Sequence, residues 1–154
     1  MGGTDELDRR LLYELYQDGA ASVPALSRKL QTSPSVLYSR IRRLMRRRII
    51  KKFTIQVDDT KLGMGVRAEV GINRSPRLKT QIHNRLMNTP EVVSITEVTG
   101  RFDILVTVQV ADLETLHATV IDKLGKIEGV RNTETFVELD RIDKDPSYLK
   151  PIDA

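Results

Sequence analysis

Residues 33–48 read SPSVLYSRIRRLMRRR, and they indicate how the N-terminal third of the chain folds. Ser33 is a typical helix N-cap and Pro34 suits a first helical turn, so the stretch predicts a helix from Pro34 to Arg48. On a 3.6-residue wheel, one side is apolar and the other carries hydroxyls and guanidiniums. The apolar side consists of Val36, Leu37, Ile41 and Leu44, and the outer side of Ser35, Tyr38, Ser39, Arg42, Arg43 and Arg46.

Two more helices are predicted before this one. Leucines recur at helical spacing from Asp5 to Gln17, with Asp5 as N-cap and Asp18-Gly19 as the stop. A second helix runs from about Pro24 to Leu30. Because only three or four residues separate it from the helix that starts at Pro34, the pair predicts a helix-turn-helix.

The positive charge of the chain is concentrated in this module. Residues 1–52 contain 12 Lys and Arg against 5 Asp and Glu, a net of +7, whereas residues 53–154 contain 13 against 16, a net of −3. A basic helix on a mildly acidic remainder is typical of a nucleic-acid-binding module joined to a second domain. The alternative, that the arginines only form a solvated face, is less favoured because that face has almost no acidic partners.

The rest of the chain alternates strand and helix. The predicted order is βαββαβ, which defines a ferredoxin-like sandwich of four antiparallel strands with two helices on one face. The fold class is therefore α+β. The predicted domains are 1–50 (helix-turn-helix), 51–65 (a linking strand and hinge), 66–141 (ferredoxin-like) and 142–154 (an irregular tail). The expected elements are strand 67–73, helix 76–88, strands 92–99 and 103–110, helix 113–126 and strand 130–139.

A two-layer sandwich leaves one face of its sheet bare. Four apolar strand residues, Ile72, Val106, Val108 and Val110, suggest that this face needs cover. A second copy of the chain would supply it, so we expect a homodimer.

Several other kinds of site are disfavoured. The chain has no Cys, which excludes disulfides and cysteine zinc sites, and with no long apolar run a cytoplasmic protein without membrane contact is expected. Residues 63–68 match G-x-G-x-x-A but lead into a strand, so they predict a linker and not a dinucleotide loop. His83 and His117 lie on different helices without a second ligand nearby. We therefore expect no metal, no cofactor and no catalytic group, although a spatial triad is not visible in a sequence.

The turn Val98-Thr99-Gly100-Arg101-Phe102-Asp103 has two properties of an amino-acid site. Its backbone amides could face an anion, and Asp103 could accept from an ammonium group. The alternative is an ordinary hairpin in which Asp103 pairs with Arg101 or Arg131.

Over residues 5–140 the chain resembles the Lrp/AsnC (feast/famine) family of transcription regulators. Residues 5–12 resemble the opening D-x-x-D-x-x-I/L-L of the family. Residues 30–36 and 40–44 resemble its helix-turn-helix, Asp58 with Lys61-Leu62-Gly63 resembles its linker, and residues 98–103 resemble its V-x-G-x-Y/F-D turn.

The resemblance implies a winged-helix-like DNA-binding domain and a ferredoxin-like domain that forms dimers, tetramers or octamers. It also implies an amino-acid effector bound between dimers at Thr99, Gly100, Arg101 and Asp103. The family usually has Gly where Arg48 stands, in a left-handed turn that would strain an arginine. Arg40 falls toward the apolar side of its helix, where it could pair with Asp5 or Asp8.

The sequence thus predicts a regulator that binds a pseudo-palindromic site on double-stranded DNA and responds to a free amino acid. The predicted DNA-binding residues are Ser33, Ser35, Tyr38, Ser39, Arg42, Arg43, Arg46, Arg47, Lys51 and Lys52. Arg42, Arg43 and Arg46, with Lys51 and Lys52, would contact phosphates. Ser35, Tyr38 and Ser39 would contact base edges. Two alternatives remain: a sirohaem decarboxylase-like enzyme on the same fold, and a sensor that acts through protein partners.

Overall fold

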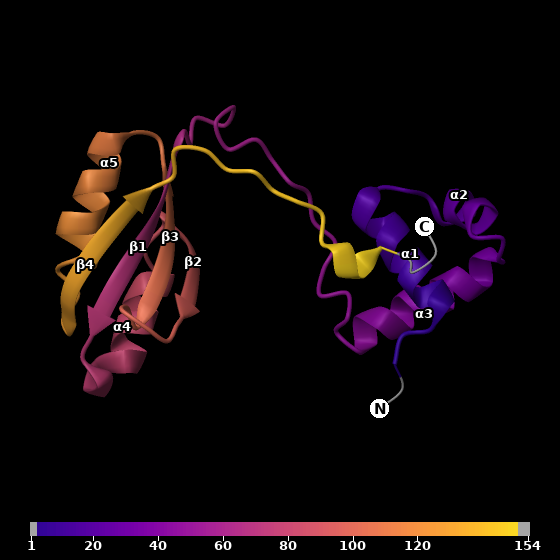
Figure 1. The fold of residues 1–154 in the computed structure, drawn as a ribbon, viewed down its shortest axis with the longest axis horizontal. Helices are drawn as coiled ribbons and strands as arrows, with labels where there is room; N and C mark the ends of the chain where they lie inside the picture. Colours follow the sequence, from indigo (N-terminus) through magenta and orange to yellow (C-terminus); the bar gives the residue numbers. More distant parts are fainter. Residues whose placement is uncertain (1–2, 151–154) are drawn as a thin grey trace. The chain divides into compact units, whose positions relative to one another are not determined.

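The computed structural model describes residues 3–150 and divides the chain into two compact units. One unit contains the residues up to 56 together with those from 143 onward, and the other contains residues 57–142. Figure 1 shows the helical unit and the sheet-containing unit, which are described separately below.

The helical unit is built from α1 (Glu6–Gln17), α2 (Val23–Lys29) and α3 (Pro34–Arg46). Each begins at a side-chain cap, because Asp5, Ser22 and Ser33 accept hydrogen bonds from backbone N–H groups in the first turn that would otherwise lack partners. A core of buried leucines joins the three helices: Leu11, Leu26, Leu30, Leu37 and Leu44. The predicted helix-turn-helix is confirmed.

The third helix ends two residues before the predicted Arg48. Arg48 has a φ of +55°, so an arginine occupies the left-handed position that glycine usually fills. The backbone N–H groups of Ile49 and Ile50 both reach the carbonyl of Leu44, which closes the helix end. Arg48 therefore carries the strain that the sequence predicted for it.

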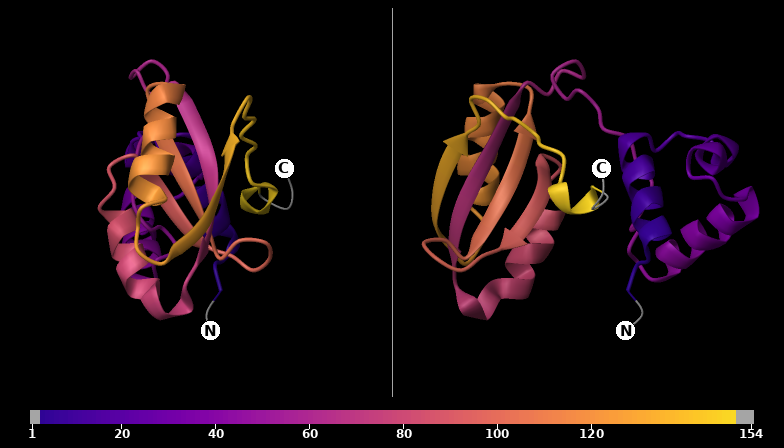
Figure 2. Two further views of the ribbon diagram at one scale, coloured as in Figure 1. Left: turned by 90° about the vertical axis from the view of Figure 1, so that its left-hand side faces the viewer. Right: turned by 45° about the vertical axis from the view of Figure 1, so that its right-hand side comes forward.

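The second unit contains a four-stranded antiparallel sheet in the order β2-β3-β1-β4. Its helices lie on one face, as the left view of Figure 2 shows, and the ferredoxin-like prediction is confirmed. The strands are β1 (Val66–Arg74), β2 (Val92–Glu97), β3 (Ile104–Val110) and β4 (Val130–Val137). The helix predicted at residues 76–88 consists of a 3-10 turn, η1 (Pro76–Leu78), and the α-helix α4 (Lys79–Met87). The helix predicted at residues 113–126 consists of α5 (Leu113–Ala118) and a π-helical segment, η2 (Thr119–Leu124).

The prediction about the bare face of the sheet is wrong. Ile72, Val106, Val108 and Val110 are buried in the core that the helices cover. The register pairs Ile72 with Ile104 and Val70 with Val106, so these alternate residues share one face. The opposite face carries Glu69, Thr107 and Ser94, which are joined by hydrogen bonds. An apolar sheet face is thus no argument for a dimer.

The linking strand predicted within residues 51–65 does not form. Residues 51–58 have no regular secondary structure, and a turn follows from Asp59 to Gly63. A strand needs a neighbouring strand for its hydrogen bonds, and no described segment of this chain pairs with it. Phe53, Ile55 and Val57 are consequently exposed.

Of the predicted tail, residues 142–150 are described and 151–154 lie outside the described residues. The described part has one short 3-10 turn, η3 (Ser147–Leu149), and no other regular secondary structure. This turn lies against α1, within the helical unit (Figure 1). The side-chain amide of Gln17 donates a long hydrogen bond of 3.5 Å to Asp145.

Candidate nucleic-acid interface and ligand turn

The outer face of α3 is a continuous exposed surface with a shallow hollow. The hollow is lined by Ser35, Tyr38, Ser39, Arg42, Met45 and Arg46. Five of these residues were predicted from the sequence to contact DNA. Met45 was missed, although its position seven residues after Tyr38 places it on the same side of a helical wheel.

Ser33 has a structural role at the start of this face. Its hydroxyl accepts from the backbone N–H of Val36 at 3.4 Å and lies 3.1 Å from the Ser35 hydroxyl. The N-terminal end of α3 therefore presents the hydroxyls of Ser33 and Ser35, groups that can bind phosphate oxygens.

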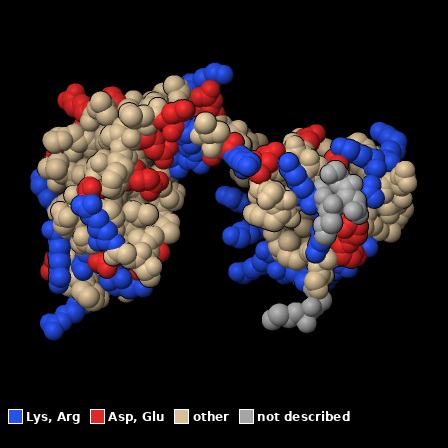
Figure 3. Space-filling view, in the orientation of Figure 1, with Lys and Arg blue, Asp and Glu red and all other residues tan. Residues whose placement is uncertain are grey.

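The charge on the outer face is positive and unneutralised. Figure 3 shows Lys and Arg side chains projecting from the helical unit. Arg42 and Arg46 make no ion pair or hydrogen bond with the described residues, and both are exposed. Lys51 and Lys52, which follow α3, are exposed as well. These side chains are available to an external anion.

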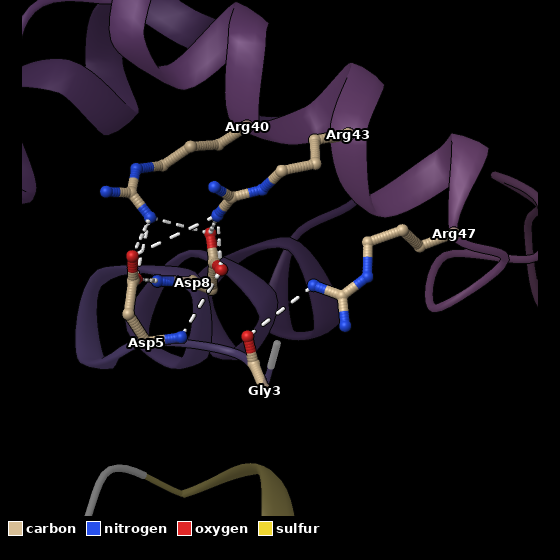
Figure 4. Close-up of polar contacts among 6 residues, drawn as sticks. All are labelled: Gly3, Asp5, Asp8, Arg40, Arg43 and Arg47. Carbon is tan, nitrogen blue, oxygen red and sulfur yellow. Dashed lines mark hydrogen bonds and ion pairs between the residues drawn. The ribbon is translucent and has the colours of Figure 1, made fainter. Parts of the chain in front are cut away.

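Arg40 and Arg43 belong to a different, internal cluster (Figure 4). Asp8 on α1 is fully buried, and its carboxylate accepts from Arg40 at 2.8 Å and from Arg43 at 2.6 Å. Arg40 also donates to Asp5 at 2.6 Å. The pairing of Arg40 with both aspartates confirms the sequence interpretation.

This cluster changes the interpretation of Arg43. Its guanidinium, predicted to contact DNA, is held by a buried carboxylate in the free protein, although 42% of its side chain is exposed. The sequence wheel missed this because Arg43 lies at the border between the two faces. The pKa of Asp5 is lowered, first by the hydrogen bond from Arg40 and then by the backbone N–H of Asp8.

Arg47 was also predicted to contact DNA. Its guanidinium donates to the backbone carbonyl of Gly3 at 3.5 Å, a long contact that ties the start of the chain to the end of α3 (Figure 4).

The turn at residues 98–103 is held by hydrogen bonds of its own. Gly100 has a φ of +132°, which favours glycine at this position. One carboxylate oxygen of Asp103 accepts from the backbone N–H of Arg74 at 2.9 Å, at the end of β1. Thr99 is exposed. Asp103 therefore fixes the turn to the sheet with one oxygen and leaves the other available.

Arg101 and Phe102 attach the same turn to β4. Arg101 pairs with Glu134 at 2.6 Å, and its guanidinium lies 5.4 Å from the Phe102 ring centroid. Phe102 meets Phe136 edge to face at 6.2 Å. The alternative pairing of Asp103 with Arg101 or Arg131 is thus not formed.

The two histidines lie on separate helices, His83 on α4 and His117 on α5. His83 Nε2 lies 3.2 Å from Glu97, which also accepts from Lys79 at 2.6 Å and Arg74 at 3.3 Å. Because of Lys79 above all, the pKa of Glu97 is lowered. No group of potential metal ligands occurs in the described part of the chain.

The structure also bears on the dinucleotide-binding motif and on membrane-spanning helices. The glycines of the G-x-G-x-x-A match precede strand β1 and do not open a helix, so they form no dinucleotide loop. Among residues 3–150, no helix is long and apolar enough to span a bilayer.

Comparison with known proteins identifies the class. The sequence-family model of the AsnC-type helix-turn-helix domain matches residues 5–45. The family model of the Lrp/AsnC ligand binding domain matches residues 67–148. A similar protein is an uncharacterized HTH-type transcriptional regulator of Pyrococcus abyssi, 35% identical, with 86% of this chain and 84% of the relative covered. The HTH-type transcriptional regulator FL11 of Pyrococcus furiosus is 30% identical over 96% of this chain and 97% of its own length.

Solved structures show the same fold. AsnC of E. coli matches with a TM-score of 0.87 and 24% identity, covering 94% of this chain and 98% of that one. A Neisseria meningitidis transcriptional regulator in complex with L-Met matches with a TM-score of 0.88 and 22% identity, covering 94% and 96%. The chain therefore belongs to the Lrp/AsnC family, and it is a DNA-binding transcription regulator of that type.

Proposed function

We propose that the outer face of α3 binds the major groove of double-stranded DNA at a pseudo-palindromic site. The observation that carries this proposal is the exposed row of hydroxyls and unpaired guanidiniums on α3, in particular Arg42 and Arg46. Hydroxyls and arginine forks are the groups that bind base edges and phosphates. Ser33, Arg47, Lys51 and Lys52 flank the row and contact phosphates in this proposal.

A salt-titrated gel shift tests this role, using the DNA upstream of the gene for this protein in the presence of competitor DNA. The wild type should bind saturably, and Arg42→Ala should bind more weakly at every salt concentration. Arg77→Ala, which removes an exposed arginine from the sheet-containing unit, is the matched control. Equal affinity for wild type and Arg42→Ala would contradict the proposal.

We also propose that the turn at residues 98–103 binds a free amino acid. Gly100 has no side chain and a φ of +132°, so a ligand can approach the backbone of the turn closely. The second oxygen of Asp103 is available to accept from an ammonium group. The L-Met complex of the Neisseria relative supports an amino acid as ligand.

Asp103→Asn tests this site because an amide oxygen can still accept from the Arg74 N–H while the charge is lost. Calorimetry with each standard amino acid in turn should show binding to the wild type and none to Asp103→Asn. Wild-type binding that persists in the variant would place the ligand elsewhere.

The functional unit in this proposal is a homodimer that assembles to a tetramer or octamer. Phe53, Ile55 and Val57 alternate in exposed backbone without a partner strand, so a second copy pairing there would bury them. A dimer also places two α3 helices on half-sites about 34–36 Å apart or a multiple of it. Ultracentrifugation should show a dimer or larger, and Ile55→Lys should weaken it.

The same proposal places the protein in the cytoplasm and assigns it no catalysis. The relatives reported above are named as transcriptional regulators, and no observation favours the decarboxylase-like alternative.

A further inference from the structure

The outer face of α3 exposes two side chains with large apolar parts that phosphate binding does not use, the ring of Tyr38 and the thioether chain of Met45. Tyr38 is 49% exposed and Met45 is 44% exposed, and both line the hollow. They are the first and last members of a row, with Arg42 between them at helical spacings of four and three residues. Charged and apolar groups therefore alternate along one stripe.

An apolar side chain in this position is removed from water favourably only against an apolar partner. The basic side chains around the hollow favour DNA as its occupant, because Arg42 and Arg46 flank it without acidic partners among the described residues. The apolar group that a base edge presents in the major groove is the C5-methyl of thymine. Methionine suits such a contact because its thioether is polarisable and its side chain adapts its shape.

We propose that Met45 and Tyr38 each bind a thymine methyl group, on either side of the base pair or phosphate that Arg42 contacts. Seven helical residues span about 10.5 Å, which corresponds to about three base-pair steps of 3.4 Å. Because the projection of this length on the DNA axis is at most about 10.5 Å, the half-site carries two thymines at most about three steps apart, on either strand. This inference rests on the proposed DNA-binding role of α3 and adds the chemistry that α3 recognises.

The test removes single methyl groups from DNA. A duplex enriched from a random-sequence pool by the full-length protein is resynthesised with one thymine at a time replaced by uracil, which leaves the hydrogen-bonding edge unchanged. Loss of one buried methyl should weaken binding about fourfold. We expect this loss at two positions in each half-site.

The variants assign each methyl to a side chain. In Met45→Ala the uracil effect should disappear at one of the two positions, and in Tyr38→Ala at the other. Both residues are exposed, so the variants should fold like the wild type. Met87→Ala, which truncates a 74% exposed methionine on α4, is the matched control and should retain both effects.

Two results would overturn the proposal in different ways. An enriched duplex in which no uracil replacement weakens binding, or in which both effects persist in Met45→Ala and Tyr38→Ala, contradicts thymine recognition alone. A pool from which no sequence is enriched contradicts sequence-specific DNA binding itself, and thymine recognition with it.

Discussion

The outer face of α3 and the turn at residues 98–103 both carry charged side chains, but they use them differently. On α3, Arg42 and Arg46 have no ionic partner among the described residues. In the turn, Arg101 is paired with Glu134, and Asp103 is bonded to the backbone of β1. The helix face is therefore ready for an external polyanion, whereas a ligand at the turn must use backbone amides and the remaining carboxylate oxygen.

The same contrast exists within α3. Arg42 and Arg43 are neighbours in the sequence, yet one is free and the other is bound to the buried Asp8. The internal cluster fixes how α3 lies on α1, whereas the exposed Arg42 and Arg46 have the DNA-binding role proposed above. Composition alone does not distinguish these two kinds of arginine on one helix.

The largest effect is expected from breaking the internal cluster. Asp8→Ala leaves Arg40 and Arg43 without their buried partner, and removing one member of such a group costs about 3 kcal/mol of stability. Urea unfolding followed by far-UV circular dichroism should show the helical unit destabilised and the sheet-containing unit unchanged. Asp122→Ala, which removes an exposed pair with Lys126, is the matched control and should leave the stability unchanged.

A smaller effect is expected where the turn attaches to the sheet. A Cβ at Gly71 would lie 2.5 Å from the Phe102 ring, so Gly71→Ala must push the ring aside and should cost about 2 kcal/mol. In the double variant with Phe102→Ala, most of the Gly71→Ala penalty should vanish. Additive costs in a double-mutant cycle would show that the ring does not cover Gly71 in solution.

Arg48→Gly should stabilise the helical unit. Relief of the left-handed backbone is worth about 1–2 kcal/mol, and the extra freedom of glycine in the unfolded chain offsets about half of it. A gain of about 0.5–1 kcal/mol in urea unfolding is expected. Arg46→Gly, two residues earlier at the last position of α3, should instead cost up to about 1 kcal/mol; a loss at both positions would argue against a left-handed Arg48.

The smallest effect concerns pH. The pKa of Asp5 is lower in the folded chain, so its stabilisation is complete above the unfolded pKa of about 3.9 and is lost as the pH falls through the folded pKa. The urea midpoint of the helical unit should therefore decrease with acidification below about pH 4. Asp5→Asn should flatten this dependence, and an unchanged slope would mean that Arg40 does not hold Asp5.

Much of this architecture could be predicted from local chemistry. The caps Asp5 and Ser33, the leucine spacing and the alternating apolar residues each follow from one segment of sequence. Arg40 could be assigned to Asp5 and Asp8 because its place on the wheel excluded it from the outer face.

The missed features depend on neighbours that a single segment does not reveal. Apolar residues such as Ile72 and Val106 recur with a period of two along their strands, which makes one face of the sheet apolar. The helices of the same unit already cover that face, so it is not left for a second copy. Arg43 lies at the edge of its helix, where only the position of Asp8 decides its partner. Residues 51–58 look like a strand but have no strand beside them in one chain.

We propose that adjacent arginines on α3 have different partners: Arg42 binds DNA, and Arg43 binds the buried Asp8. The most direct measurement is the salt dependence of DNA affinity for Arg42→Ala and Arg43→Ala, each beside wild type. We expect Arg42→Ala to lower the slope of log K against log salt by about 0.9, because one phosphate contact is lost. Arg43→Ala should lose stability with little change in slope. An equal reduction of the slope in both variants would contradict the account, because Arg43 would then leave Asp8 to bind DNA.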